Sequence, residues 1–334
     1  MTVSEDDWTQ LEAEQHSTGV VMRRLFPRST QDIFLAVQQP SGRRMLVLRV
    51  PSSAAEAQVR RGALPSTRGL ALQFVPADTG RRDLQVVLIA DDRREVFNPL
   101  ISDMAATAET EADPAEALHR AVERFEYWRQ LLQSIADTGL SPEARRGLYG
   151  ELTVLRDHFL PNLPAGEAVQ TWTGPTGANQ DFQTRSAAIE VKTGTATEPQ
   201  SIVIANERQL DDTGAGQLLL AHLSLDERRG GAGETLPLII DAIRAAVTSA
   251  ESRSILDDRL ARVGYLTSQR HLYEEPRYTI RKIQFWRVTG QFPRIVEADL
   301  RPGVGHCRYR ISTTGLDQYR VSAEQVACIV KGEA

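Results

Sequence analysis

The chain has 334 residues, of which 41% are hydrophobic and 25% charged, which is enough for two or three globular units with hydrophobic cores. Its formal net charge of -5 argues against a protein that coats nucleic acid non-specifically, because non-specific DNA binding depends on neutralising phosphates. The two cysteines, Cys307 and Cys328, are not at metal-ligand spacing, so the sequence indicates neither a disulfide framework nor a zinc site.

The N-terminal segment predicts a protein that stays in the cytoplasm. Residues 1–15 are acidic and lack the apolar core of a signal peptide. No stretch of the sequence approaches the roughly 20 apolar residues that are needed to cross a bilayer, so we expect no membrane association.

Residues 31–99 are predicted to form an antiparallel β unit. Four strand-like runs are joined in pairs by a Pro-Ser-Gly turn and an Ala-Asp-Thr-Gly turn. The small and acidic residues at 104–114 then predict a linker. We therefore expect an N-terminal β-rich unit over residues 1–110.

Two helices are predicted from matching start signals. Asp113 can cap a helix whose first position is Pro114, and this is the linking helix that we expect over residues 111–140. Ser141 and Pro142 repeat the signal. The second helix then carries an apolar stripe of four residues, Leu148, Leu152, Leu155 and Phe159. We expect this helix to pack on an apolar surface.

An α/β unit is predicted over residues 141–230. After its helix, residues 180–194 are typical of a β-hairpin, and further strands are expected at 201–206 and 217–225. Asn206 can cap a short helix between these last two strands. The order of helix, three strands, helix and strand favours a single α/β fold.

The segment "AAIEVKTG" at 187–194 carries the candidate chemistry. Side chains alternate along a strand, so Glu190 and Lys192 point to one side, roughly 7 Å apart, while the apolar residues between them point into the packed face. Asp181, on the preceding strand of the hairpin, can stand beside Glu190. Two carboxylates and one ammonium are therefore expected to converge.

This cluster suits metal-assisted phosphodiester hydrolysis. Two carboxylates held close together repel unless a cation lies between them, and Mg²⁺ prefers one or two carboxylates with waters and phosphate oxygens, so Asp181 and Glu190 are candidate ligands. Lys192 could orient the attacking water or offset charge on the phosphate. It is one of three lysines among 39 basic residues, and a compact ammonium suits this task better than a planar guanidinium.

These residues resemble the PD-(D/E)XK nuclease superfamily. Its core is a helix bearing a glutamate, followed by strands that carry an Asp and then an (Asp/Glu)-x-Lys triplet. Glu151 in "LYGELTVL" matches the helix glutamate. Asp181, eight intervening residues and the triplet 190–192 match the strand motif, with Gln180 where the superfamily's name has proline.

The run "GLYGELTVL...NQDFQ...AIEVKTG...IVIANERQLDD", over about residues 141–226, is similar to the bacterial PD-(D/E)XK motif proteins, a group often found in phage-defence gene neighbourhoods. The resemblance implies an α/β class, α+β overall, with a restriction-endonuclease-like core and a mixed sheet. An antiparallel N-terminal β unit and a helical and strand-rich C-terminal unit would flank this core. It also implies that Glu151 joins the metal site and that Gln209 reaches it from the following helix.

The function that the resemblance implies is a Mg²⁺-dependent endonuclease, with Mn²⁺ able to substitute, that cleaves DNA in prokaryotic defence. Its partners would be DNA and other defence-system proteins, and cutting two strands with one site per chain favours a homodimer. A second hypothesis is a catalytically silent DNA-binding or adaptor subunit that keeps the fold. A third is a scaffold in which Glu190 and Lys192 form only a solvated salt bridge.

Residues 231–334 are predicted to contain two helices and a twisted set of strands that ends near Val321. From Pro276 to Val321, nine basic residues outnumber three acidic ones, a local charge of +6. The cations alternate with aromatic residues, as in surfaces that track phosphates and stack on bases. We expect DNA contacts from Arg281, Lys282, Arg287, Arg308 and Arg310; the alternative is an ordinary sheet with charged outward positions.

Other chemistries lack their motifs. None of the six histidines forms an H-x-x-x-H pair or stands beside a second ligand type at metal spacing. The glycine-rich runs lack a following Lys-Ser/Thr, which excludes a phosphate loop for ATP. A G-x-S-x-G nucleophile elbow is also absent.

Overall fold

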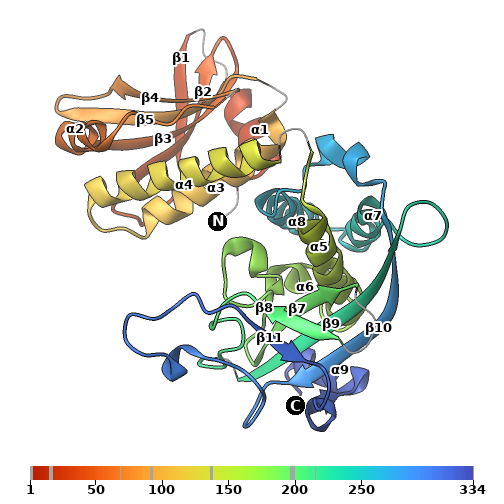
Figure 1. The fold of residues 1–334 in the computed structure, drawn as a ribbon. Helices are drawn as coiled ribbons and strands as arrows, with labels where there is room; N and C mark the ends of the chain where they lie inside the picture. The colour runs from red at the N-terminus through yellow and green to blue at the C-terminus, as the bar shows by residue number, and fades with distance from the viewer. Residues whose placement is uncertain are drawn as a thin grey trace. The chain divides into compact units, whose positions relative to one another are not determined.

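The computed structural model describes residues 3–14, 18–67, 69–90, 93–135, 138–195, 200–214 and 216–333. The chain divides into two compact units, Met1–Asp137 and Thr138–Ala334, and each is described by itself (Figure 1). Among the described residues, no helix has both the length and the apolar character that a membrane span requires.

The first unit is built on a five-stranded antiparallel sheet with strand order β1-β2-β3-β5-β4. The strands are β1 (Gly19–Arg24), β2 (Asp32–Gln39), β3 (Arg43–Pro51), β4 (Leu70–Pro76) and β5 (Arg81–Leu88). The four strands predicted over residues 31–99 are confirmed as β2 to β5. The sequence did not predict β1, which pairs with β2 at one edge of the sheet.

The α-helices of the first unit, within its described residues, are α1 (Glu5–Ala13), α2 (Ser52–Arg61), α3 (Arg94–Glu109) and α4 (Pro114–Ser134). The linker predicted at 104–114 is wrong over its first half, because residues up to Glu109 continue α3. Alanine is the strongest helix former, and Met104 and Ala108 are buried on this helix. α4 begins as predicted, with Asp113 as its cap, and packs against α3 within this unit.

The second unit is built on a five-stranded mixed sheet with strand order β12-β10-β9-β7-β6, in which β7 and β9 run parallel. The strands are β6 (Phe182–Gln183), β7 (Ala187–Gly194), β9 (Gln217–Arg228), β10 (Arg277–Arg287) and β12 (Arg320–Val321). A separate sheet pairs β8 (Ser201–Ile204) with β11 (Tyr309–Ser312). The α-helices are α5 (Pro142–Val154), α6 (Ala165–Thr171), α7 (Leu236–Ala246), α8 (Ala250–Arg262) and α9 (Ala323–Lys331). The mixed sheet and its helices confirm the predicted α/β, restriction-endonuclease-like core.

Helix α5 lies directly against β7. It begins as predicted, since the Ser141 side chain accepts a hydrogen bond from Ala144 N. The predicted apolar stripe along α5 and the π-helical turn after it is buried at all four positions. A Cβ at Gly150 would lie 2.3 Å from Thr193 Cγ2 on β7, so glycine allows this close approach. The contact brings Glu151, the next residue of α5, to the strand that carries Glu190.

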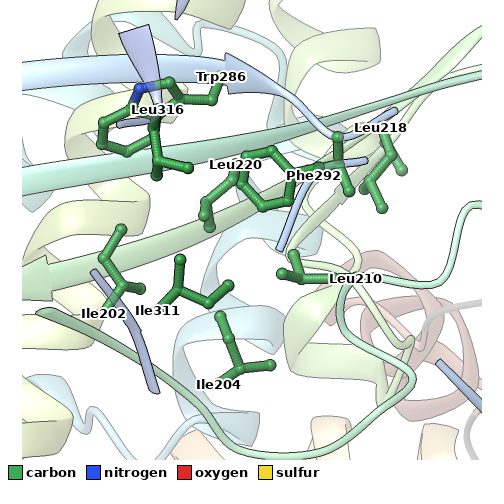
Figure 2. Close-up of a cluster of buried hydrophobic side chains, with 11 residues drawn as sticks. Ile202, Ile204, Leu210, Leu218, Leu220, Trp286, Phe292, Ile311 and Leu316 are labelled. Carbon is green, nitrogen blue, oxygen red and sulfur yellow. The ribbon is translucent and has the colours of Figure 1, made fainter. Parts of the chain in front are cut away.

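The small β8–β11 sheet packs against the main sheet through a buried hydrophobic cluster (Figure 2). The cluster includes Leu218 and Leu220 of β9, Trp286 of β10, Ile202 and Ile204 of β8, and Ile311 of β11. Leu210, from the turn after β8, also lies in it and is fully buried. This turn is therefore anchored to the core of the second unit.

The short helix predicted after Asn206 is wrong, because residues 206–210 form turns. Asn206 Oδ1 accepts a hydrogen bond from Arg208 N at 2.9 Å, and Gln209 Oε1 accepts one from Ala205 N at 2.8 Å. Side-chain hydrogen bonds of this kind satisfy backbone groups locally and compete with helix formation.

Replacing the close-contact glycine tests the packing of α5 on β7. Gly150→Ala should lower the free energy of unfolding by about 1–3 kcal/mol, because the added methyl overpacks against Thr193. Thr193→Ser removes the opposing methyl, so the double variant should recover most of the loss. Chemical denaturation of the four proteins measures both effects. If the double variant were destabilised as much as Gly150→Ala alone, this account would be contradicted.

Candidate active site

The β6–β7 hairpin holds Asp181 beside Glu190. Phe182 pairs with Ile189 in antiparallel register, and continuing this register sets Asp181 opposite Glu190, as predicted. β6 ends after two residues, and Asp181 Oδ2 accepts the hydrogen bond of Val191 N at 2.7 Å. The aspartate is therefore fixed against the strand that carries the candidate triplet.

Glu190 and Lys192 form a buried ion pair. Lys192 Nζ lies 2.6 Å from Glu190 Oε1, and the two side chains are 19% and 1% exposed. This burial removes the alternative of a solvated salt bridge on an outer face of the sheet. Neither carboxylate oxygen of Glu190 has a hydrogen bond among the described residues; Oε1 has the ion-pair contact with Lys192, and Oε2 is left unsatisfied.

Glu151 brings a third carboxylate to the same place. Its Oε2 accepts a hydrogen bond from Trp172 Nε1 at 2.7 Å, and Trp172 is fully buried. A Cβ at Gly174 would lie 2.9 Å from Asp181 Oδ1 and 3.6 Å from Glu151 Oε2. Both carboxylates therefore border one glycine, where a larger residue would intrude between them.

Burial raises the pKa of all three carboxyl groups. The pKa of Glu190 rises to about 8, mainly because of burial. The negative charge of Asp181 also raises this pKa, and the nearby Lys192 ammonium lowers it. Burial and Asp181 raise the pKa of Glu151 well above its ordinary value, although the bond from Trp172 lowers it. Burial also raises the pKa of Asp181, although the positive charge of Lys192 lowers it. Three acids beside one ammonium thus favour either bound protons or an additional cation.

Asp181 and Glu190 have the chemistry of Mg²⁺ ligands. The described residues contain no group of three or more His, Cys, Asp or Glu side chains arranged to hold a metal. Mg²⁺ does not need such a cage, since it commonly uses one or two carboxylates and keeps several waters. The unsatisfied Glu190 Oε2 and the adjacent Asp181 carboxylate fit that requirement. Glu151 stands beside them as a carboxylate oriented by Trp172.

Gln209 was predicted to reach the acid site, but its side-chain oxygen makes a local hydrogen bond instead. Its amide oxygen is used by Ala205 N, and none of its hydrogen bonds within the described part of the chain reaches the acids. The turn that carries it is nevertheless tied to the site, because Gln180 Nε2 donates to Arg208 O at 3.0 Å. Gln180 directly precedes Asp181, so the turn and the acid share one support.

The predicted DNA-contacting cations are all exposed but lie on separate parts of the second unit. Arg281 and Lys282 stand at a register shift in β10, where Arg281 also pairs with Asp226 at 2.7 Å. Arg287 is the last residue of β10, about 20 Å from Arg281 along an extended strand. Arg308 and Arg310 flank Tyr309, which packs against the buried cluster.

Sequence reasoning missed Trp172 and Gly174. The stretch "TWTGPTG" has the composition of a turn, and its glycines point to backbone geometry rather than to chemistry. Trp172 was the residue that could have indicated this contact, because a buried indole N–H needs a hydrogen-bond acceptor. The sequence does not identify Glu151 as that acceptor, because the spacing between the two residues follows neither a helical nor a strand period.

A protein-family model described as "Putative PD-(D/E)XK family member, (DUF4420)" matches residues 4–314. This match confirms the resemblance that the motifs at 141–226 indicated and extends it to nearly the whole chain. No curated protein and no solved structure gives a significant match.

In the absence of divalent metal, stability should fall as the pH rises from about 4.5 to about 8. The folded pKa of Glu190 is about 8 against an ordinary value of 4.5, so the folded state holds the extra proton in this window. Stability then decreases with pH and levels off above the folded pKa. Calorimetry in a chelator should show a flatter dependence for Glu190→Gln. Glu251→Gln, an exposed control on α8, should keep the wild-type slope; equal slopes for all three proteins would refute the assignment.

Proposed function

The chain belongs to the PD-(D/E)XK family whose model covers residues 4–314, and we propose that it is a Mg²⁺-dependent endonuclease that hydrolyses DNA phosphodiester bonds. The supporting observation is the convergence of Asp181, Glu190 and Lys192 at one buried point. Glu190 Oε2 is unsatisfied within the described residues, as expected of an oxygen that binds a cation.

Asp181 and Glu190 would hold the ion, and Mn²⁺ would substitute for Mg²⁺. When bound, the ion would polarise the scissile phosphate and lower the pKa of a water molecule. Asp181 is held by Val191 N, so its carboxylate is oriented in advance. Glu151 is held by Trp172 in the same way and adds a third negative charge that favours a cation.

Lys192 acts as the cationic group of the site. Its ammonium is fixed by Glu190 Oε1 at 2.6 Å and is mostly screened from solvent. From this position it can donate to the attacking water or to a phosphate oxygen, where it offsets the negative charge of the reacting phosphate. A planar guanidinium is larger and presents a fixed fork of donors, so arginine would not fill the same role.

A non-cleaving DNA-binding or adaptor subunit is the second candidate. Burial of Glu190 to 1% exposure favours it, because a phosphate can reach this carboxylate only if nearby groups give way. The complete set of two acids and one lysine favours the nuclease, since an adaptor has no need to keep all three. DNA binding that does not depend on Lys192 would be its signature.

In this proposal the protein acts in the cytoplasm of a prokaryote, in defence against foreign DNA, with DNA and other defence proteins as its partners. It rests on the similarity of the motif run at 141–226 to proteins of phage-defence neighbourhoods. A homodimer suits this task, because the described residues of each chain form one such acid cluster and a duplex has two strands to cut.

Substitutions of Lys192 and Asp181 test the proposed catalysis. With Mg²⁺ or Mn²⁺, the purified chain should cleave plasmid and phage DNA, and Lys192→Ala or Asp181→Ala should reduce the rate by at least about 10²-fold. Lys192→Arg should lose nearly as much, because the charge remains but its shape changes. Lys331→Ala, an exposed lysine on α9, should cleave like the wild type.

Cleavage that survives Lys192→Ala and Asp181→Ala would contradict this site assignment. Absence of cleavage by the wild type, together with DNA binding that all four variants retain, would favour the adaptor.

Salt dependence tests the proposed DNA-contacting arginines. Arg308→Ala and Arg310→Ala should each reduce the slope of log K against log salt concentration by about 1, because each removes one phosphate contact. Arg120→Ala is the control, since that guanidinium is already paired with glutamates on α4. Fluorescence anisotropy with labelled duplex DNA measures the slopes. Unchanged slopes for both Arg308→Ala and Arg310→Ala would exclude this segment from the interface.

A further inference from the structure

A polar cavity of about 420 Å³ is lined by residues that lie close in sequence to Asp181 and Glu190. It opens between the β6–β7 hairpin and the turn that follows β8. Gln180 lines it directly before Asp181, and Ala188 lines it two residues before Glu190, on the same side of β7. Ala187 and Ala188 are small side chains at the start of β7, which leaves room for the cavity. The cavity and the acids are therefore neighbouring parts of one site.

The two walls of the cavity are joined by hydrogen bonds. Gln180 Nε2 donates to Arg208 O at 3.0 Å and to Asp211 O at 3.3 Å, which links the hairpin to the turn. Gln183 Nε2 donates to Gln180 Oε1 at 3.0 Å. Figure 2 shows Leu210, from the same turn, inside the buried cluster. The cavity is thus formed in advance, as ligand sites usually are.

The charged side chains of the lining balance. The lining includes two arginines, Arg185 and Arg208, and two acids, Asp211 and Glu297. Arg208 Nε lies 3.6 Å from Glu297 Oε2 and both side chains are more than half exposed, so this ion pair is weak. Arg185 and Asn179 are exposed, and neither makes a hydrogen bond or ion pair with another residue in the described ranges. Both remain available to a ligand.

A nucleobase fits this lining better than a phosphate does. A phosphate selects a surplus of positive charge, which the balanced lining does not offer, and it is far smaller than the cavity. A base edge presents donors and acceptors together, which amide and guanidinium groups read in pairs. Unstacked bases also lie on the flat face of an arginine.

We propose that the cavity binds one nucleobase of the substrate strand, turned out of the base stack next to the scissile phosphate. Asn179 reads the edge of the base and Arg185 covers its face. This inference rests on the proposed nuclease function, because the acid cluster defines where the scissile phosphate lies. The two residues then determine sequence preference without taking part in hydrolysis.

Binding of single nucleotides in a chelator tests the cavity without catalysis. Ligand-observed NMR with the four deoxynucleoside 5′-monophosphates should detect at least one that binds the full chain about tenfold or more tightly than deoxyribose 5-phosphate. Asn179→Ala and Arg185→Ala should each lose about tenfold in this affinity. Arg229→Ala, the control for an exposed arginine outside the cavity lining, should bind like the wild type.

The cleavage pattern is the second readout. On a random-sequence substrate the wild type should prefer one base at a fixed position beside the cut, and Asn179→Ala should lose the preference while still cleaving. Nucleotide binding by a chain that proves unable to cleave DNA would refute the nuclease and leave the cavity supported. Equal binding of deoxyribose 5-phosphate and every nucleotide, or unchanged binding by both cavity variants, would overturn the inference.

Discussion

Three carboxyl groups against a single ammonium are the constraint on which the second unit depends; Glu190 is buried, and Glu151 and Asp181 are partly buried. Glu151, Asp181 and Glu190 come from α5, the residue before β6, and β7, so three elements must meet within a few ångströms. Like charges repel strongly away from water, and burial accordingly raises the pKa of each group. The structure tolerates this cost because Lys192, Val191 N and Trp172 each bind one carboxylate.

Supporting contacts extend beyond the residues that touch the acids. Arg259 of α8 donates hydrogen bonds to the carbonyl oxygens of Val169, Gln170 and Trp172. It thereby fixes the end of α6 and the indole that orients Glu151. Gly174 N donates to Asp181 O at 2.9 Å, so the same short segment holds a second acid. Residues 169–174 thus couple two of the three carboxylates to a helix that is distant in sequence.

Much of this arrangement could be predicted from the sequence, because local rules determine it. Asp113 and Ser141 predicted two helix starts, and strand alternation with a short hairpin predicted that Asp181 and Glu190 stand together. The pairing of β8 with β11 and the bond from Trp172 to Glu151 could not be predicted, because they join segments without a periodic relation. Burial of Glu190 was missed for the same reason, because the β8–β11 sheet packs against Ala188, which lies on the same side of β7 as Glu190.

The central claim is that Asp181 and Glu190 bind a divalent cation that balances the buried negative charge. Anomalous diffraction from crystals of the full chain grown with Mn²⁺ tests it most directly. The account predicts a Mn²⁺ peak in contact with the carboxylates of Asp181 and Glu190, and its absence from crystals of Asp181→Ala. A wild-type site without Mn²⁺ at saturating concentration, or a peak that contacts neither carboxylate, would contradict the account.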